Sequence, residues 1–111
     1  MRQPLVVLTL LVAGSTAYAT TWTGVPLTDQ ACSRKVASNP DAHTKSCALQ
    51  CAKSGYGILD SKGNFLKFDK AGNDQALQLL KSTQANDHLR VNVEGEEKDG
   101  VLQVKSLKMV Q

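Results

Sequence analysis

Alternating apolar and polar residues in the last quarter of the chain predict a β-hairpin. Leu89, Val91 and Val93 alternate with polar residues, a period of two that places one face of a strand in a core. A second apolar-rich run, residues 101–107, follows the turn sequence Lys-Asp-Gly at residues 98–100. We therefore expect these two segments to pair as antiparallel strands.

Two further stretches predict the remaining strands. Residues 21–27 indicate a short first strand, in which Pro26 stands near the end, where a missing backbone donor matters least. Residues 56–59 and 65–68 flank a polar run at residues 60–64 and predict a second hairpin. The chain is therefore expected to contain five strands.

The segment between the first two strands has the features of a helix at residues 41–54. Asn39 is a candidate N-cap, Pro40 suits the first helical position, and Gly55 is a natural stop. Residues 33–40 show no sustained periodicity and are expected to form a surface connection. The first strand should therefore lead through a loop into this helix.

A second helix completes the predicted fold. Residues 76–80 carry an apolar stripe, which predicts a helix capped at Asn73 or Asp74 and ending near residues 82–86. The order strand, helix, two strands, helix, two strands indicates a mainly β protein with helices. We predict a small five-stranded OB-like barrel with two helices, formed by residues 20–111 as a single domain.

The first nineteen residues have the features of an export leader. Arg2 is followed by an apolar run at residues 5–13 and by Ala17-Tyr18-Ala19, an A-x-A cleavage pattern. We predict a signal peptide at residues 1–19 and an exported protein, periplasmic or secreted. The apolar run is shorter than the ~20 residues that a spanning helix needs, and no later segment is apolar enough. The mature chain is thus expected to have no membrane span.

Charge and motif content narrow the function classes. The formal net charge is +3, and the lysines are interspersed with Asp and Glu, which argues against nucleic acid as a partner. The chain has no G-x-S-x-G sequence and no glycine-rich phosphate loop. His88, next to Asp87, is expected to be an exposed turn residue. We therefore predict a protein that is not an enzyme and that binds a small ligand or another protein.

A Cys/His cluster is the most distinctive chemistry in the sequence. His43, Cys47 and Cys51 stand four residues apart, so a helix would place them on one face in successive turns. Cys32 lies a short loop upstream. These four side chains are the concentrated soft metal ligands and redox-active groups of the chain.

One interpretation of the cluster is a structural disulfide from Cys32. A bond from Cys32 to Cys47 or to Cys51 would enclose roughly fifteen to twenty residues and could contribute ~3 kcal/mol. A bond between Cys47 and Cys51 is disfavoured because thiols on successive helical turns project in parallel. Disulfides persist in exported proteins, and an odd cysteine count leaves one thiol unpaired.

The alternative is a metal site with Cys32, His43, Cys47 and Cys51 as ligands. Three thiolates and an imidazole are a common tetrahedral set for zinc and also suit copper(I). His43 and Cys51 would be separated by about 12 Å of helix rise, so all four converge only if the helix begins or ends within this run. Without a metal, His43 is expected to face solvent or to cap the helix. Disulfide and metal both stay open.

Several motifs of the chain resemble those of small secreted bacterial proteins of unknown function with an OB-like fold. The most specific motif is residues 43–57, which contain the histidine and two of the cysteines. The other matching positions are residues 22–25, Asp29, Cys32 and residues 62–69, 71–73, 90–95 and 104–107. The resemblance implies an OB-like fold over the whole predicted mature chain. It implies no established activity and no catalytic residues.

Overall fold

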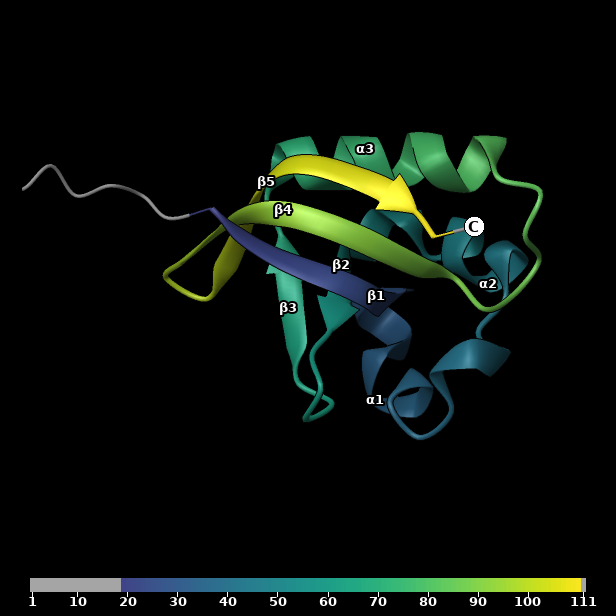
Figure 1. Cartoon of the computed structure of the whole chain (residues 1–111). Coiled ribbons are helices and arrows are strands. Elements are labelled where there is room, and N and C mark those ends of the chain that lie inside the picture. The colour runs from purple at the N-terminus through teal and green to yellow at the C-terminus, as the bar shows by residue number, and fades with distance from the viewer. Residues whose placement is uncertain (1–18, 111) are drawn as a thin grey trace, which may run out of the picture.

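Five strands close into a barrel in the computed structural model, which describes residues 19–110 (Figure 1). The strand order is β1-β2-β3-β5-β4, and β4 pairs back onto β1. Only β3 and β5 pair in parallel, through two residues on each strand. The predicted five-stranded OB-like barrel is therefore confirmed. Its strands are β1 (Thr20–Asp29), β2 (Tyr56–Leu59), β3 (Phe65–Phe68), β4 (Arg90–Lys98) and β5 (Val101–Met109).

Both predicted hairpins are present, and three further strand pairings, β1 with β2, β1 with β4 and β3 with β5, close the barrel. β2 and β3 have the predicted bounds, and β4 and β5 turn at Asp99 and Gly100, whose φ angles are 54° and 78°. A positive φ at both central residues gives the turn the twist that a two-residue hairpin needs. The apolar faces of the strands form the core, in which Phe68 and Tyr56 are each 1% exposed.

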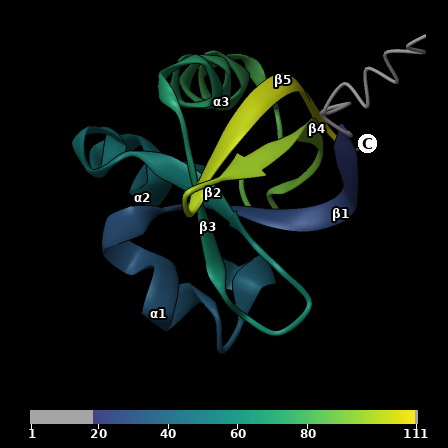
Figure 2. The same cartoon turned by 90° about the vertical axis from the view of Figure 1, so that its left-hand side faces the viewer.

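Within residues 19–110, three α-helices lie on the outside of the strands, one more than predicted. These are α1 (Ser33–Val36), α2 (Lys45–Gln50) and α3 (Lys70–Ser82), supplemented by 3-10 turns at Gln30–Cys32, Pro40–Ala42 and Ala52–Ser54. Figure 2 shows α3 and α1 on different sides of the barrel. The segment that joins β1 to β2, residues 30–55, contains α1, α2 and all three 3-10 turns. We call it the β1–β2 insertion.

The prediction of one continuous helix at residues 41–54 is wrong. The backbone is extended at His43 and Thr44, with ψ angles of 127° and 153°. Thr44 is the N-cap of α2, because its side chain accepts a hydrogen bond from the Cys47 amide at 3.1 Å. The expected cap, Asn39, makes no such side-chain bond. The surface connection expected at residues 33–40 also differs, because it contains α1.

The helix α3 begins earlier than predicted because of its cap. The Asp69 carboxylate accepts a hydrogen bond from the Gly72 amide at 2.9 Å, so the helix starts at Lys70. Gly72 lies inside the helix where it crosses the barrel, and a Cβ there would stand 2.5 Å from Val104. The glycine therefore serves close packing and not the turn that its sequence suggests. Asn73, a predicted cap, instead accepts a hydrogen bond from the Tyr56 amide.

The predicted signal peptide falls almost entirely outside the described residues. Only its last residue, Ala19, is described, and it lies just before β1. Among the described residues, no helix has the length and apolar character needed to cross a membrane. The leader and the cleavage site stay predictions.

Candidate functional site

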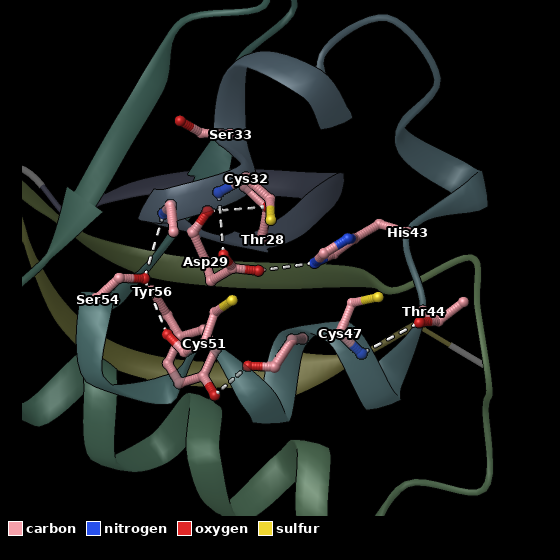
Figure 3. Close-up of polar contacts among 12 residues, drawn as sticks. Thr28, Asp29, Cys32, Ser33, His43, Thr44, Cys47, Cys51, Ser54 and Tyr56 are labelled. Atoms are coloured by element: carbon pink, nitrogen blue, oxygen red, sulfur yellow. Dashed lines mark hydrogen bonds and ion pairs between the residues drawn. The ribbon is translucent and has the colours of Figure 1, made fainter.

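The site is built around Asp29, the last residue of β1. Its side chain is completely buried, and both carboxylate oxygens have partners (Figure 3). Oδ1 lies 2.9 Å from His43 Nε2, and Oδ2 accepts the Cys32 amide at 3.0 Å. Asp29 is thus the N-cap of the 3-10 turn that carries Cys32. The carboxylate holds two parts of the β1–β2 insertion against the end of the strand.

Two of the three cysteines meet next to this carboxylate. One carboxylate oxygen of Asp29 and the sulfurs of Cys32 and Cys51 all lie within 4.8 Å of one another. Figure 3 shows both sulfurs on the same side of the insertion as the Asp29 carboxylate. Burial, the negative charge of Asp29 and the neighbouring Cys51 raise the pKa of the Cys32 thiol to about 11. Cys32 is therefore a neutral thiol at physiological pH.

His43 is buried, which corrects the expectation that it faces solvent or caps a helix. It is 8% exposed, and its ring contacts the Asp29 carboxylate. The reason is the extended backbone at residues 43 and 44, which interrupts the helix and directs the imidazole toward the end of β1. The histidine is thus attached to the site through Asp29. It does not belong to the group of three ligand atoms.

Cys47 lies apart from the other two thiols. It is exposed, and its sulfur is not in the group formed by Asp29, Cys32 and Cys51. The predicted single face of His43, Cys47 and Cys51 does not form, because α2 begins after His43 and ends before Cys51, which is its C-cap. Cys47 does share a cavity of about 290 Å³ with Cys32 and His43. The exposed Cys47 thiol therefore lies on the same cavity as Cys32 but outside the group of three ligand atoms.

Hydrogen bonds of the Ser54 side chain and of the backbone hold the two ends of the insertion together and so bring Cys32 close to Cys51. The Ser54 hydroxyl donates to the Cys51 carbonyl at 2.8 Å and accepts the Ala31 amide at 3.2 Å. The Gln30 amide donates to the Gly55 carbonyl at 2.9 Å. The bond between Gln30 and Gly55 continues the β1–β2 ladder outward, and the Ser54 side chain joins the two 3-10 turns that flank the thiols. Strand pairing and the Ser54 hydroxyl together therefore bring Cys32 to face Cys51.

A second set of contacts fixes the insertion to the loop before β4. Arg90 binds Asp41 through two nitrogens, at 2.9 Å and 3.2 Å, and donates a third bond to the Gly24 carbonyl. The hydrogen bond from Arg90 lowers the pKa of Asp41 from its usual value. The Asp41 carbonyl also accepts the amide of His88, which is exposed as predicted. The insertion is thus held at both its base and its middle.

Asp29 is the functional residue that the sequence interpretation did not assign to the site. Its position three residues before Cys32 fits an N-cap, which would have been the available signal. Its proximity to Cys51 and His43 depends on the fold of the whole insertion. All three cysteines are free thiols in this structure. The disulfide and metal interpretations therefore stay predictions.

The different surroundings of the thiols predict an order of reactivity. With the protein folded and reduced at neutral pH, iodoacetamide should modify Cys47 first and Cys32 at least about tenfold more slowly. Cys47 is exposed, whereas Cys32 is partly buried and has a pKa of about 11, so few Cys32 thiolates are present. Mass mapping of peptides over time measures both rates. Equal rates for Cys32 and Cys47 would contradict the arrangement.

Comparison with models of known families, with curated proteins and with solved structures finds no match. The resemblance to small secreted OB-like proteins accordingly stays an expectation from the sequence. The observation that bears on function is the geometry of Asp29, Cys32, His43 and Cys51.

Proposed function

We propose that the chain is an exported OB-like binding or structural module, without catalytic activity, whose β1–β2 insertion is closed by a disulfide between Cys32 and Cys51. The observation that carries this proposal is the proximity of the two sulfurs, within 4.8 Å in the folded chain. The predicted leader supports it, because thiols this close are oxidised readily in an exported compartment. The sequence allowed Cys47 or Cys51 as the partner, and the geometry favours Cys51.

The bond would connect the two 3-10 turns at the base of the insertion. Cys32 ends the turn after β1, and Cys51 precedes the turn that leads into β2. The closed loop has roughly twenty residues, for which the chain-entropy model gives ~3 kcal/mol. This is a large contribution for a domain of this size, whose total stability is about 5–15 kcal/mol. The insertion would then present a fixed surface on one side of the barrel.

A binding role for the module is supported by the cavity beside the thiols. Its wall combines the apolar residues Val36 and Ala42 with hydroxyl, amide and amine groups from the insertion. Ligand sites are typically concave, with a largely apolar wall and a few polar groups that orient the ligand. The cavity residues are Cys32, Lys35, Val36, Ser38, Asn39, Ala42, His43, Thr44 and Cys47.

The disulfide is tested on protein recovered from the exported fraction without reductant. The protein is denatured and alkylated, and its peptides are mapped by mass. We expect one alkylated cysteine, Cys47, and one crosslinked peptide pair that contains Cys32 and Cys51. Three alkylated cysteines, or a crosslink that includes Cys47, would overturn the proposal.

Two serine variants provide matched controls for this experiment. Cys47→Ser should retain the crosslink and show no alkylation, because it removes only the exposed thiol. Cys51→Ser should show two alkylated cysteines, Cys32 and Cys47. Cys32 loses the thiol next to it, and the Cys47 sulfur is not in the group that Cys32 forms with Asp29 and Cys51. A crosslink between Cys32 and Cys47 in wild-type protein would show that the insertion rearranges and that the proposed pairing is wrong.

A further inference from the structure

We propose that, when the two thiols are reduced, Asp29, Cys32 and Cys51 bind one zinc ion as a three-ligand site. This inference goes beyond the proposed disulfide, because it assigns a second and mutually exclusive state to the same pair of thiols. It also adds a carboxylate to the ligands expected from the sequence, and it leaves His43 and Cys47 outside the group of ligand atoms.

The spacing of the three ligand atoms fits a single ion. Tetrahedral zinc with Zn–S bonds of about 2.3 Å and Zn–O bonds of about 2.0 Å has ligand atoms about 3.5–3.8 Å apart. The Asp29 oxygen and the two sulfurs lie within 4.8 Å of one another, so a contraction of about 1.3 Å at most closes the site. Rotations of the cysteine side chains are sufficient for such a shift. No backbone rearrangement is required.

The carboxylate is the feature that favours zinc over copper(I). A disulfide needs no buried acid beside it, yet Asp29 is 0% exposed and lies next to both sulfurs. Zinc accepts carboxylate oxygen together with thiolate, whereas copper(I) selects soft sulfur ligands. Two thiolates and one carboxylate therefore form a mixed set that matches a borderline ion.

His43 is the positioning residue of this site. Its Nε2 lies 2.9 Å from Asp29 Oδ1, and the Cys32 amide holds Oδ2, so the carboxylate is fixed in orientation before an ion arrives. Hydrogen-bonded partners of ligands typically contribute 10–100-fold to metal affinity. His43 is itself buried, which keeps this contact dry. We infer that its role toward the ion is indirect.

The cavity reaches one ligand of the ion, Cys32, and the positioning residue His43 from the surface. Asp29 and Cys51 are not among its lining residues. Cys47 lies on the same cavity but outside the ligand group. The fourth position is accordingly filled by solvent, as in zinc sites with three protein ligands.

The test is a zinc titration of fully reduced protein under anaerobic conditions, against a competing chromophoric chelator, with native mass to count ions. We expect one zinc per chain. Cys51→Ser should abolish stoichiometric binding. His43→Gln should weaken it 10–100-fold, and Asp29→Asn, which alters a ligand directly, should weaken it at least as much. Cys47→Ser is the matched control and should bind zinc within about threefold of wild type.

Several results would overturn the zinc site. One is that fully reduced protein, with three free thiols by titration, binds no zinc. The others are that Asp29→Asn binds zinc with wild-type affinity, or that Cys47→Ser loses zinc binding. Copper(I) binding that is unchanged by Asp29→Asn, with zinc bound no better, would show a two-thiolate copper site instead. The fold of each variant is checked by circular dichroism, and Cys51→Ser covers the case in which Asp29→Asn fails to fold.

Failure of this inference is distinguishable from failure of the proposed disulfide. Oxidation of metal-free Asp29→Asn should still produce the crosslink between Cys32 and Cys51, because a disulfide does not need the carboxylate. In wild-type protein, bound zinc should slow peroxide oxidation of the same two cysteines, as their sulfurs are then coordinated. If oxidation proceeds at the same rate with and without zinc, the ion is bound elsewhere and the site is wrong.

Discussion

Asp29→Ala should lower the free energy of unfolding by about 3 kcal/mol in reduced, metal-free protein. The substitution leaves the buried His43 ring and the Cys32 amide without their acceptor. A buried polar group without a partner costs about 1–3 kcal/mol, and loss of an N-cap adds about 1 kcal/mol. Urea unfolding followed by the fluorescence of Trp22, the single tryptophan, measures the change.

The matched control for this substitution is Asp29→Asn. Its amide oxygen can accept one of the two hydrogen bonds that Asp29 accepts, and its volume is nearly the same. We expect the loss to be at most about half of that in Asp29→Ala. If Asp29→Ala unfolds within about 0.5 kcal/mol of wild type, the carboxylate is not what holds the insertion to β1.

The second large effect is expected at Gly57, in the middle of β2. A Cβ at this position would stand 2.2 Å from the Leu66 carbonyl oxygen and 2.7 Å from the Phe65 ring. Backbone cannot move away as a flexible side chain can, so Gly57→Ala must push β2 and β3 apart. We expect a loss of about 3 kcal/mol, at the upper end for overpacking. The same urea titration measures it.

Lys67→Ala provides the control for the strand pair. Lys67 stands directly opposite Gly57 on β3 and is exposed, so its truncation should change stability by no more than about 0.5 kcal/mol. A Gly57→Ala protein as stable as this control would show that β2 and β3 can separate without cost. It would also weaken the case for a closed barrel, since β2 joins β1 to β3.

The strands could be predicted from sequence because their signals are local. Alternation of apolar and polar residues predicted the hairpin of β4 and β5. A polar run between two short segments predicted the hairpin of β2 and β3, whose bounds agree with the prediction. The Asp99-Gly100 pair marks a turn whose geometry those residues adopt readily. The OB-like barrel followed because five strands in this order bury one face only by closing.

The helices were predicted less well because their ends depend on side-chain caps with more than one possible choice. Asn39 and Thr44 both fit an N-cap, and the sequence pattern favours Asn39 because of the proline after it. In the folded chain Thr44 forms the cap bond. Likewise the sequence before Asn73 does not show that α3 already includes Gly72, where the close approach of Val104 requires a glycine.

The candidate site was predicted only in part, because its geometry also depends on where the helices begin and end. The sequence identified the cysteines and the histidine as the reactive groups, and Cys32 and Cys51 do meet. It could not separate Cys47 from Cys51, because that depends on where α2 ends. Nor could it show that Asp29 and His43 contact each other, since they stand fourteen residues apart, with α1 and two 3-10 turns between them.

The contacts between the insertion and the loop before β4 determine how the protein opens. Arg90 binds Asp41, the His88 amide donates to the Asp41 carbonyl, and the Lys45 amide donates to Asn86. A segment tied in this way does not lift from the barrel as an independent flap, so it joins the start of β4 in one cooperative unit. Closing the thiols, by a bond or by an ion, should therefore slow hydrogen exchange at amides of the loop before β4, far along the chain.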